Sequence, residues 1–304
     1  MAAKQTVAIG LPFYNCERTL ADAIRSVFAQ TDRDWELLLV DDGSTDGSLA
    51  IAQRVNDARV TVISDGLNRG LSYRLNQIAA LSMQPLLARM DADDLMHPAR
   101  VARQREFLQL NSGVDVVGSA AFIIDSAAGV TGRRGDGRFD ASPRAVLEHG
   151  LFIHPTVMGR RDWFLRHPYD PRFVRAEDRE LWCRTAGKAA FARVHEALLF
   201  YREPAQVNVA NYLQSCATDR RILRQYGPDI VGGARTQRLL TTSYLKDLCY
   251  RTADLAGRTD LLVRRRNHVL TPVELRTAAA TVERILCTPV PGFEPAGAHG
   301  GAAA

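Results

Sequence analysis

Short hydrophobic runs alternate with segments of helical spacing along the first hundred residues. The runs cover residues 7–11, 35–40, 60–63 and 86–90. Between them, apolar residues recur every three or four positions, as in Leu20, Ile24 and Val27, in Leu49, Ala52 and Val55, and in Leu71, Leu75 and Ile78. Short buried strands separated by amphipathic helices are typical of βαβ units. The pattern therefore predicts an α/β fold with a Rossmann-like, mainly parallel sheet and flanking helices.

The pattern changes after residue 114. We expect strands over 114–124 and 191–201, short helices over 160–166 and 177–185, a mobile glycine- and arginine-rich loop over 126–140, and mainly helices over 211–287. The segment 289–304 is rich in small residues and proline and is predicted to be disordered. The chain thus divides into an α/β domain (1–205), a C-terminal helical region (206–288) and a tail (289–304).

Polar or turn-forming residues follow all four early hydrophobic runs. The four segments are Pro12–Asn15, Asp41–Gly47, Asn68–Gly70 and Asp91–Asp94. In open parallel sheets, ligands bind beyond the carboxyl ends of the strands. We therefore expect these segments to form one site.

The acidic segment Asp91-Ala92-Asp93-Asp94 places three carboxylates within four residues. Carboxylates held this close repel one another unless a cation lies between them. Mg²⁺ or Mn²⁺ accepts one or two carboxylates together with phosphate oxygens of a substrate. The alternative is a structural one, in which Asp93 or Asp94 caps a helix that begins near Pro98.

The segment Asp41–Gly47 (DDGSTDG) has three interpretations. An EF-hand is excluded because its twelfth position is Gln53 instead of a bidentate glutamate. A turn and helix cap would use Ser44 or Asp46. In a nucleotide pocket, one carboxylate would instead accept a hydrogen bond from the N3–H of a pyrimidine.

The sequence contains neither the dinucleotide fingerprint GxGxxG nor the P-loop GxxxxGK[ST]. Phosphate groups must then be bound without a glycine-rich loop, which favours a metal ion assisted by Arg69 or Arg74. A solvated helix position is the alternative for either arginine.

Glu177 and Asp178 open the predicted helix over 177–185. An acidic pair in a first turn is stabilised by the helix dipole. The functional alternative is a general base that accepts the proton of an attacking hydroxyl. His154 precedes an apolar stretch, where a lone histidine is more often structural than catalytic.

Composition places the chain among globular proteins, with 46% hydrophobic and 24% charged residues in a total of 304. Residues 1–204 contain equal numbers of acidic and basic side chains, so the net charge of +5 belongs to residues 205–304. This basic region suits either a solvated helix bundle or an acidic membrane surface. Five dispersed cysteines without a C-x-x-C pair argue against disulfides or zinc. With no long apolar run or leader segment, we expect a cytoplasmic protein.

Six motifs occur together in one order. They are PFYN, VDDGSTDGS, NRG, DADD, HPTVMGRR and AEDRELW, and they span about residues 7–202. This set resembles the family 2 glycosyltransferases, in particular the bacterial enzymes that build O-antigen, capsule or exopolysaccharide repeats. The ordered set is far more specific than any one of its motifs.

The resemblance implies a GT-A fold, a nucleotide-sugar donor such as a UDP-sugar, a divalent metal ion (Mn²⁺ or Mg²⁺) and inversion at the anomeric carbon. It also implies a saccharide or lipid-linked acceptor. From the charge asymmetry and the absence of a spanning segment, we expect the basic helical region to meet that acceptor at the cytoplasmic face of the inner membrane. The residues carried over for the donor are Pro12, Tyr14, Asp42, Asn68, Arg74 and Asp91, with Asp42 at the uracil. Those for the metal are Asp93 and Asp94. Asp178 is the expected base, with His154, Glu177 and Trp182 on the acceptor side.

The sequence departs from the family pattern at two places. Many relatives have a histidine after the last strand, in Tyr-Arg-x-His, where this chain reads Tyr201-Arg202-Glu203-Pro204. Relatives also often place an arginine directly before the asparagine of the third helix. Here Leu75 precedes Asn76 and Arg74 stands one residue early.

Two other classes of protein compete with this interpretation. A sugar-nucleotidyltransferase needs a glycine-rich, basic loop after the first strand, and Pro12–Glu17 has neither property. A non-catalytic binder of anionic membranes or nucleic acid would use the basic C-terminal third. That third contains no known nucleic-acid-binding motif, so no nucleic acid partner is expected.

Overall fold

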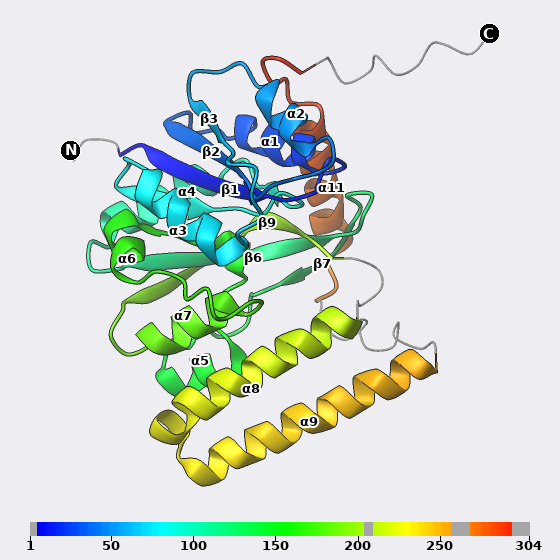
Figure 1. The fold of residues 1–304 in the computed structure, drawn as a ribbon. Helices are drawn as coiled ribbons and strands as arrows, with labels where there is room; N and C mark the ends of the chain where they lie inside the picture. The colour runs from blue at the N-terminus through cyan, green and yellow to red at the C-terminus, as the bar shows by residue number, and fades with distance from the viewer. Residues whose placement is uncertain (1–4, 204–208, 257–267, 294–304) are drawn as a thin grey trace.

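A computed structural model describes residues 5–203, 209–256 and 268–293. Its centre is a nine-stranded mixed sheet with the order β3-β2-β1-β4-β8-β6-β9-β5, in which β7 pairs with β6 (Figure 1). The strands are β1 (Val7–Phe13), β2 (Trp35–Asp41), β3 (Val60–Ile63), β4 (Leu86–Arg89), β5 (Leu95–Met96), β6 (Val116–Ile124), β7 (Val130–Arg134), β8 (Met158–Arg160) and β9 (Phe191–Arg202).

The first four strands form the parallel part of the sheet. Gly10 of β1 lies opposite Leu38 on β2 and Arg89 on β4, and Phe13 lies opposite Asp41. This register brings the polar segments that follow β1, β2 and β4 to one edge. The other half is mixed, because β8 runs antiparallel to both β4 and β6 while β6 and β9 are parallel.

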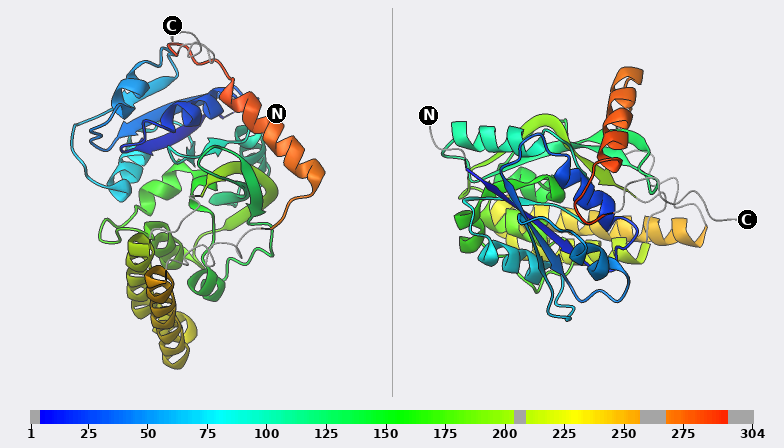
Figure 2. Two further views of the ribbon diagram at one scale, coloured as in Figure 1. Left: turned by 90° about the vertical axis from the view of Figure 1, so that its right-hand side faces the viewer. Right: turned by 90° about the horizontal axis from the view of Figure 1, so that it is seen from above.

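Helices cover both faces of the sheet (Figure 2). Alternate residues of β1 and β2 point to opposite faces. One set packs with α1 (Leu20–Phe28), α2 (Ser48–Gln53) and α4 (Arg100–Leu110). The other packs with α3 (Leu71–Leu81), α6 (Arg161–Arg166) and α7 (Glu177–Thr185). The helix α5 (Pro143–His149) and the short η1 (His154–Thr156) lie before β8 in the chain.

The C-terminal helices do not form one bundle. The hairpin of α8 (Val209–Val231) and α9 (Gly233–Leu255) packs on α5 and α7, while α11 (Pro272–Leu286) packs against α1 and β7. Figure 1 shows the hairpin at one end of the molecule and α11 beside the sheet. Among the described residues, no helix combines the length and the apolar character that a membrane span requires.

Most predicted elements are present, and two predictions are wrong. The segment 126–140 is not simply a loop, because it contains β7, which pairs with β6 from Ala121 to Ile124. The beginning of the supposed tail is ordered: Val290 is buried in the main core, and Phe293 packs against it. The remainder of that tail, and the boundary predicted at residue 205, lie outside the described residues. All five cysteines are free, as expected.

Candidate active site

Two adjoining chambers lie at the carboxyl edge of the parallel strands. The main chamber has a volume of about 1100 Å³ and includes Asp42, Asn68, Asp91, His154 and Asp178 in its lining. The side chamber has a volume of about 780 Å³, and its lining includes Pro12, Cys16 and Asp93. Most of the predicted site residues are thus brought together, from segments far apart in the sequence.

Asp42 organises the loop at the start of α3. Its Oδ1 accepts hydrogen bonds from the backbone N–H of Arg69 (2.8 Å) and from Nε of Arg74 (2.8 Å), and its Oδ2 accepts one from the N–H of Gly70 (3.0 Å). Asp42 is buried but still lines the main chamber, beside the half-exposed ring of Tyr14. The carboxylate is therefore held rigidly at the wall of the cavity.

The DDGSTDG segment also has the structural role expected of it. Oδ1 of Asp46 accepts a hydrogen bond from the N–H of Ser48 (2.9 Å) in the first turn of α2. Ser44 instead accepts one from the N–H of Asn15 (3.1 Å), which ties this segment to the loop after β1.

Arg74 does not reach the cavity. Its side chain is 0% exposed, and it forms ion pairs with Asp42 and Asp65. It also donates to Gln77 and to the carbonyl of Leu67. The prediction that Arg74 contacts the donor is therefore wrong. Arg74 instead supports the carboxylate of Asp42.

The three carboxylates of Asp91, Asp93 and Asp94 lie within 4.8 Å of one another. Asp91 and Asp93 line the cavity, while Asp94 is buried beneath them. Oδ1 of Asp94 accepts the backbone N–H of Arg202 (2.8 Å), whereas its buried Oδ2 has no hydrogen-bond partner among the described residues. The helix α4 begins at Arg100, with Ala99 as its cap, so the alternative capping role is not observed.

Electrostatics within this cluster favour a cation. Desolvation and the charge of Asp91 raise the pKa of Asp93 to about 6. Burial and the charges of Asp91 and Asp93 raise the pKa of Asp94 well above its usual range. Oxygen ligands that repel one another in this way fit a divalent ion such as Mg²⁺ or Mn²⁺.

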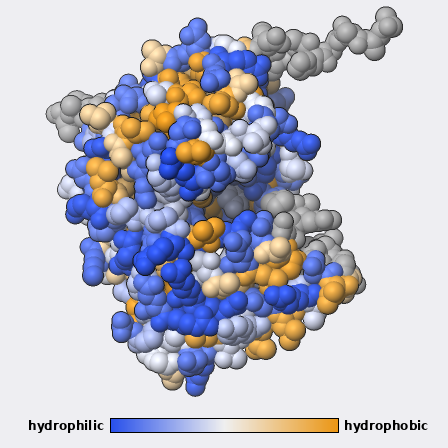
Figure 3. Space-filling view, viewed as in Figure 1, coloured by the Kyte–Doolittle hydropathy of each residue, from blue (hydrophilic) through white to orange (hydrophobic). Residues whose placement is uncertain are grey.

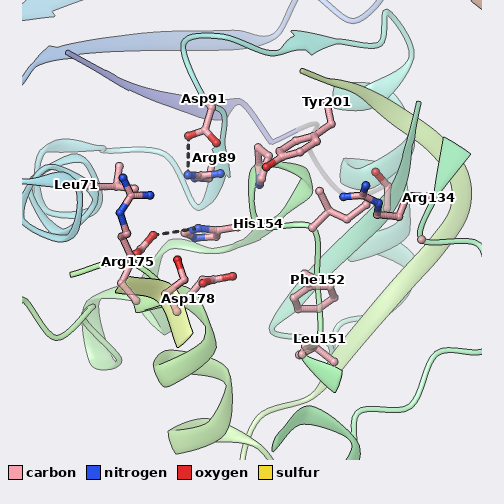
Figure 4. Close-up of a pocket in the computed structure, with 18 of the residues that line it drawn as sticks. Leu71, Arg89, Asp91, Arg134, Leu151, Phe152, His154, Arg175, Asp178 and Tyr201 are labelled. Atoms are coloured by element: carbon pink, nitrogen blue, oxygen red, sulfur yellow. Dashed lines mark ion pairs between the residues drawn. The ribbon is translucent and has the colours of Figure 1, made fainter. Parts of the chain in front are cut away.

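The second group of titratable residues lies at the start of α7 and in η1. Nδ1 of His154 is 3.6 Å from Oε1 of Glu177, and its Nε2 is 2.8 Å from the hydroxyl of Tyr169. Burial lowers the pKa of His154 to about 3, so its imidazole is neutral near pH 7. Burial also raises the pKa of Asp178. Figure 4 shows Asp178 on the opposite side of the cavity from Asp91.

Trp182 is not an acceptor contact, contrary to the sequence prediction. It is fully buried and packs against Trp163, Phe152 and Phe191. Because α7 turns this ring into the core, Trp182 supports the helix that carries Glu177 and Asp178. Its ring also meets His154 edge-on, with the centroids 6.3 Å apart.

The arginines that line the two chambers were not predicted. They are Arg18, Arg89, Arg134, Arg138, Arg175 and Arg193. Arg89 ends β4, pairs with Asp91 (2.6 Å) and lies between Asp91 and His154 in Figure 4. A sequence signal existed, because Arg89 is the one charged residue in the apolar run 86–90. Arg175 lines both chambers, and no pattern in the sequence marked it.

Arg202 belongs to the segment that lacks the family's histidine, whose position is taken by Pro204, outside the described residues. The backbone N–H of Arg202 binds Asp94, and its Nε donates to the carbonyl oxygen of Asp93 (2.7 Å). Its Nη1 donates to the carbonyls of Asp125 and Ser126. Arg202 thus fixes the backbone of the acidic cluster.

Comparison with known proteins agrees with this geometry. The family model for Glycosyl transferase family 2 matches residues 8–167. The chain is 34% identical over 186 residues to the putative glycosyltransferase EpsE of Bacillus subtilis strain 168, which covers 59% of this chain and 66% of EpsE. It is 25% identical over 181 residues to the Escherichia coli UDP-Glc:alpha-D-GlcNAc-diphosphoundecaprenol beta-1,3-glucosyltransferase WfgD, which covers 58% of this chain and 68% of WfgD.

A solved structure extends the likeness to most of the fold. The mannosyltransferase PcManGT from Pyrobaculum calidifontis, in complex with GDP-Man and Mn²⁺, matches with a TM-score of 0.58 at 15% identity, over 94% of this chain and 86% of that one. The predicted GT-A-like architecture is thereby confirmed. The match to EpsE spans just under two thirds of that relative's length.

Proposed function

Because this chain belongs to glycosyl transferase family 2, whose model matches residues 8–167, we propose that it transfers a sugar from a UDP-sugar to a hydroxyl of a saccharide or lipid-linked saccharide, with inversion. One observation carries the proposal. The acidic cluster of Asp91, Asp93 and Asp94 lies across one cavity from the carboxylate of Asp178. The name of WfgD, which acts on a sugar linked to diphosphoundecaprenol, supports the lipid-linked acceptor. We therefore propose a place in cell-surface polysaccharide synthesis.

The donor nucleoside is assigned to the wall formed by the ends of β1 and β2. Asp42 is held by two backbone N–H groups and by Arg74, and the second lone pair of Oδ2 is available to a pyrimidine N3–H. Pro12 and the exposed ring of Tyr14 offer an apolar surface for the base and ribose, and Asn68 a polar contact. A uridine nucleotide is favoured because WfgD uses UDP-Glc by name.

A divalent ion is assigned to Asp91, Asp93 and Asp94. The fit rests on the unpartnered Oδ2 of Asp94 and on the proximity of the three carboxylates. PcManGT, of similar fold, was solved with Mn²⁺. When bound, such an ion supplies positive charge next to the diphosphate that leaves.

Asp178 is assigned as the general base. A sugar or lipid-linked hydroxyl has a pKa far above neutrality, so it attacks only as a carboxylate takes its proton. Both carboxylates line the cavity, but Glu177 is buried next to the imidazole of His154, whereas Asp178 is the more accessible of the two. A single base serves a single displacement, so the anomeric carbon is inverted.

We also propose that the hairpin of α8 and α9 faces an anionic membrane that carries the acceptor. Hydrophobic side chains gather over the hairpin in Figure 3. On α9, Leu245, Leu248 and Leu255 are 58%, 58% and 89% exposed, and exposed basic residues such as Lys246 and Arg251 lie beside them. A leucine stripe flanked by basic groups suits the surface of a bilayer.

The test is a thermal-shift panel of UDP-, GDP-, dTDP- and CMP-sugars, each with and without Mn²⁺, followed by measurement of UDP release. We expect stabilisation by a UDP-sugar that requires Mn²⁺, because a ligand that binds the folded state stabilises it by mass action. Slow release of UDP without acceptor should follow. No shift with any nucleotide sugar would contradict the proposed function. A shift with GDP-sugars alone would contradict the assignment of uracil as the nucleobase of the donor.

A further inference from the structure

The two chambers of the cavity share four lining residues. They are Tyr14, Leu71, Asp91 and Arg175. The side chamber continues to Asp93, and the main chamber continues to Asp178. A donor whose diphosphate is next to the acidic cluster and whose sugar faces Asp178 must pass this junction. Arg175 is the cation among the four residues.

Among the described residues, every other arginine of the lining belongs to one chamber only. Three arginines near Asp42 and the acidic cluster are buried or already engaged. Nη2 of Arg89 pairs with Asp91, while its Nε and Nη1 are buried without a hydrogen-bond partner among the described residues. Arg74 is fully buried, and Arg202 donates to three backbone carbonyls. Arg175, by contrast, is exposed, and within the described residues only its Nε makes a hydrogen bond, to Oε1 of Gln214 at 3.0 Å. Its two terminal nitrogens are left for a ligand.

The backbone and α8 together fix the place of Arg175. Arg175 and Ala176 both have left-handed conformations, with φ of 63° and 56°, directly before α7. Non-glycine residues adopt such angles uncommonly, so the surrounding structure must hold this step.

Three residues of α8 at positions i, i+4 and i+7 stabilise this backbone conformation. They are Gln214, Thr218 and Arg221. Besides Gln214, Thr218 donates to the carbonyl of Val174 (3.1 Å) and Arg221 to that of Arg172 (3.0 Å). Residues with this spacing share one face of a helix. That face of α8 therefore contacts the loop 172–175 along its length.

We propose that Arg175 is the cation that binds the diphosphate of the donor, and that Gln214 on α8 is its positioning residue. The inference rests on the proposed function. A guanidinium presents its donors in a planar fork that matches two phosphate oxygens. With Nε held by Gln214, the Nη1 and Nη2 edge faces the junction, and Figure 4 shows the side chain reaching from the start of α7 toward Leu71.

The first test compares the affinities of UDP and of uridine by calorimetry in Mn²⁺. We expect Arg175→Gln to raise the Kd of UDP about ten- to hundredfold, the range for a hydrogen bond to a charged group, and to leave that of uridine unchanged. Arg175→Lys should recover part of the loss, since it restores the charge without the fork. Arg172→Gln is the matched control: it removes one positive charge from the same loop, where Arg172 pairs with Asp170 (2.6 Å), and should bind UDP normally.

The second test is a double-mutant cycle with Gln214→Ala. This variant should weaken UDP binding when Arg175 is present and have no further effect in the Arg175→Gln background, because Gln214 acts through Arg175. Equal weakening in both backgrounds would show that Gln214 only stabilises the fold. If Arg175→Gln binds UDP as tightly as the unaltered protein, the inference is wrong while the proposed function stands. If the unaltered protein binds neither UDP nor GDP in Mn²⁺, the proposed function itself fails.

Discussion

At the scale of single residues, the two neighbouring carboxylates at the start of α7 have different surroundings. Both line the main chamber, but Glu177 is buried beside His154 and Asp178 is more accessible. We predict that Asp178→Asn lowers the rate of transfer by about 10²- to 10⁴-fold, the usual contribution of a general base. The affinity for UDP should change little, because the amide keeps the shape of the carboxylate. Steady-state kinetics and calorimetry measure the two effects separately.

The matched control for this prediction is Glu177→Gln. It should cost less turnover than Asp178→Asn and lower the thermal stability instead, because Glu177 is buried against a neutral imidazole. A larger loss of turnover in Glu177→Gln than in Asp178→Asn would assign the general base to Glu177 instead. Full activity in both variants would show that neither residue of α7 is the general base.

The acidity of Asp178 gives a second prediction. Burial raises its pKa, and only the carboxylate form accepts a proton. The rate should therefore fall as the pH is lowered, and the midpoint of the fall should lie above the ordinary pKa of an aspartate, about 3.9. The pH profile of kcat at saturating donor and metal measures this midpoint. In Asp178→Asn the corresponding limb of the profile should disappear.

Asp93 gives a prediction about metal binding. Asp93→Ala should abolish Mn²⁺-dependent binding of UDP and leave the metal-free fold intact, because removing one of three repelling carboxylates relieves the cluster. The pKa of Asp93 is raised to about 6, so the proton competes with the ion below that pH. Mn²⁺ binding by the unaltered protein should therefore weaken between pH 7 and pH 5. Calorimetric titrations at both pH values test this, and tight Mn²⁺-dependent binding of UDP by the alanine variant would contradict the assignment.

The sequence predicted the carboxylates of the site better than its cations. Asp42, Asp91, Asp93 and Asp178 stand in short motifs at element ends, where spacing alone restricts their position. The surroundings of an arginine depend on chain segments far away. Arg175, for example, is placed by a left-handed backbone step and by Gln214, which is 39 residues distant. The direction of a side chain on a helix depends equally on packing, which turned Trp182 into the core.

At the scale of elements, hydrophobic periodicity predicted the strands and helices that bury one clear face. β3 and α7 have the predicted bounds, Val60–Ile63 and Glu177–Thr185. β7 was missed because its sequence, VTGRR, has little apolar character and gains its order from pairing with β6. The composition of residues 289–293 suggested disorder, but contacts with α1 and the loop after α2 order them. One such contact is the hydrogen bond from the N–H of Asn56 to the carbonyl of Pro291 (2.9 Å).

The ordered segment after α11 can be tested by truncating one core side chain. Val290 is 4% exposed in the main core, so Val290→Ala should lower the free energy of unfolding by about 1–3 kcal/mol. Val273 on α11 is 64% exposed, and Val273→Ala should change the free energy of unfolding by no more than about 0.5 kcal/mol. Urea denaturation measures both values. Equal stabilities for the two variants would show that this segment does not contribute to the core.

At the scale of the whole molecule, positive charge and exposed leucines occur together on the hairpin of α8 and α9, whose residues 209–255 include seven basic and four acidic side chains. Residues 1–204 have no net charge, whereas residues 205–304 contain all of the net +5. The hairpin of α8 and α9 is joined to the catalytic part by the hydrogen bond from Tyr226 to Glu180 (2.6 Å) and by the ion pair of Arg235 and Glu148 (3.1 Å). A surface that binds the hairpin would therefore be held at a fixed distance from the cavity.

We predict that the protein sediments with vesicles that contain anionic lipid and not with neutral ones. Basic residues near an anionic surface each add about 1 kcal/mol of attraction, which salt screens, so binding should weaken at high ionic strength. Leu248→Glu should reduce binding because it places a negative charge in the exposed leucine stripe of α9. The control is Leu110→Glu at the end of α4, where the leucine is also exposed, at 78%, but lies outside the hairpin. Its binding should remain normal. Sedimentation that does not depend on anionic lipid or salt, or equal loss in both variants, would show that this stripe is not a membrane-binding surface.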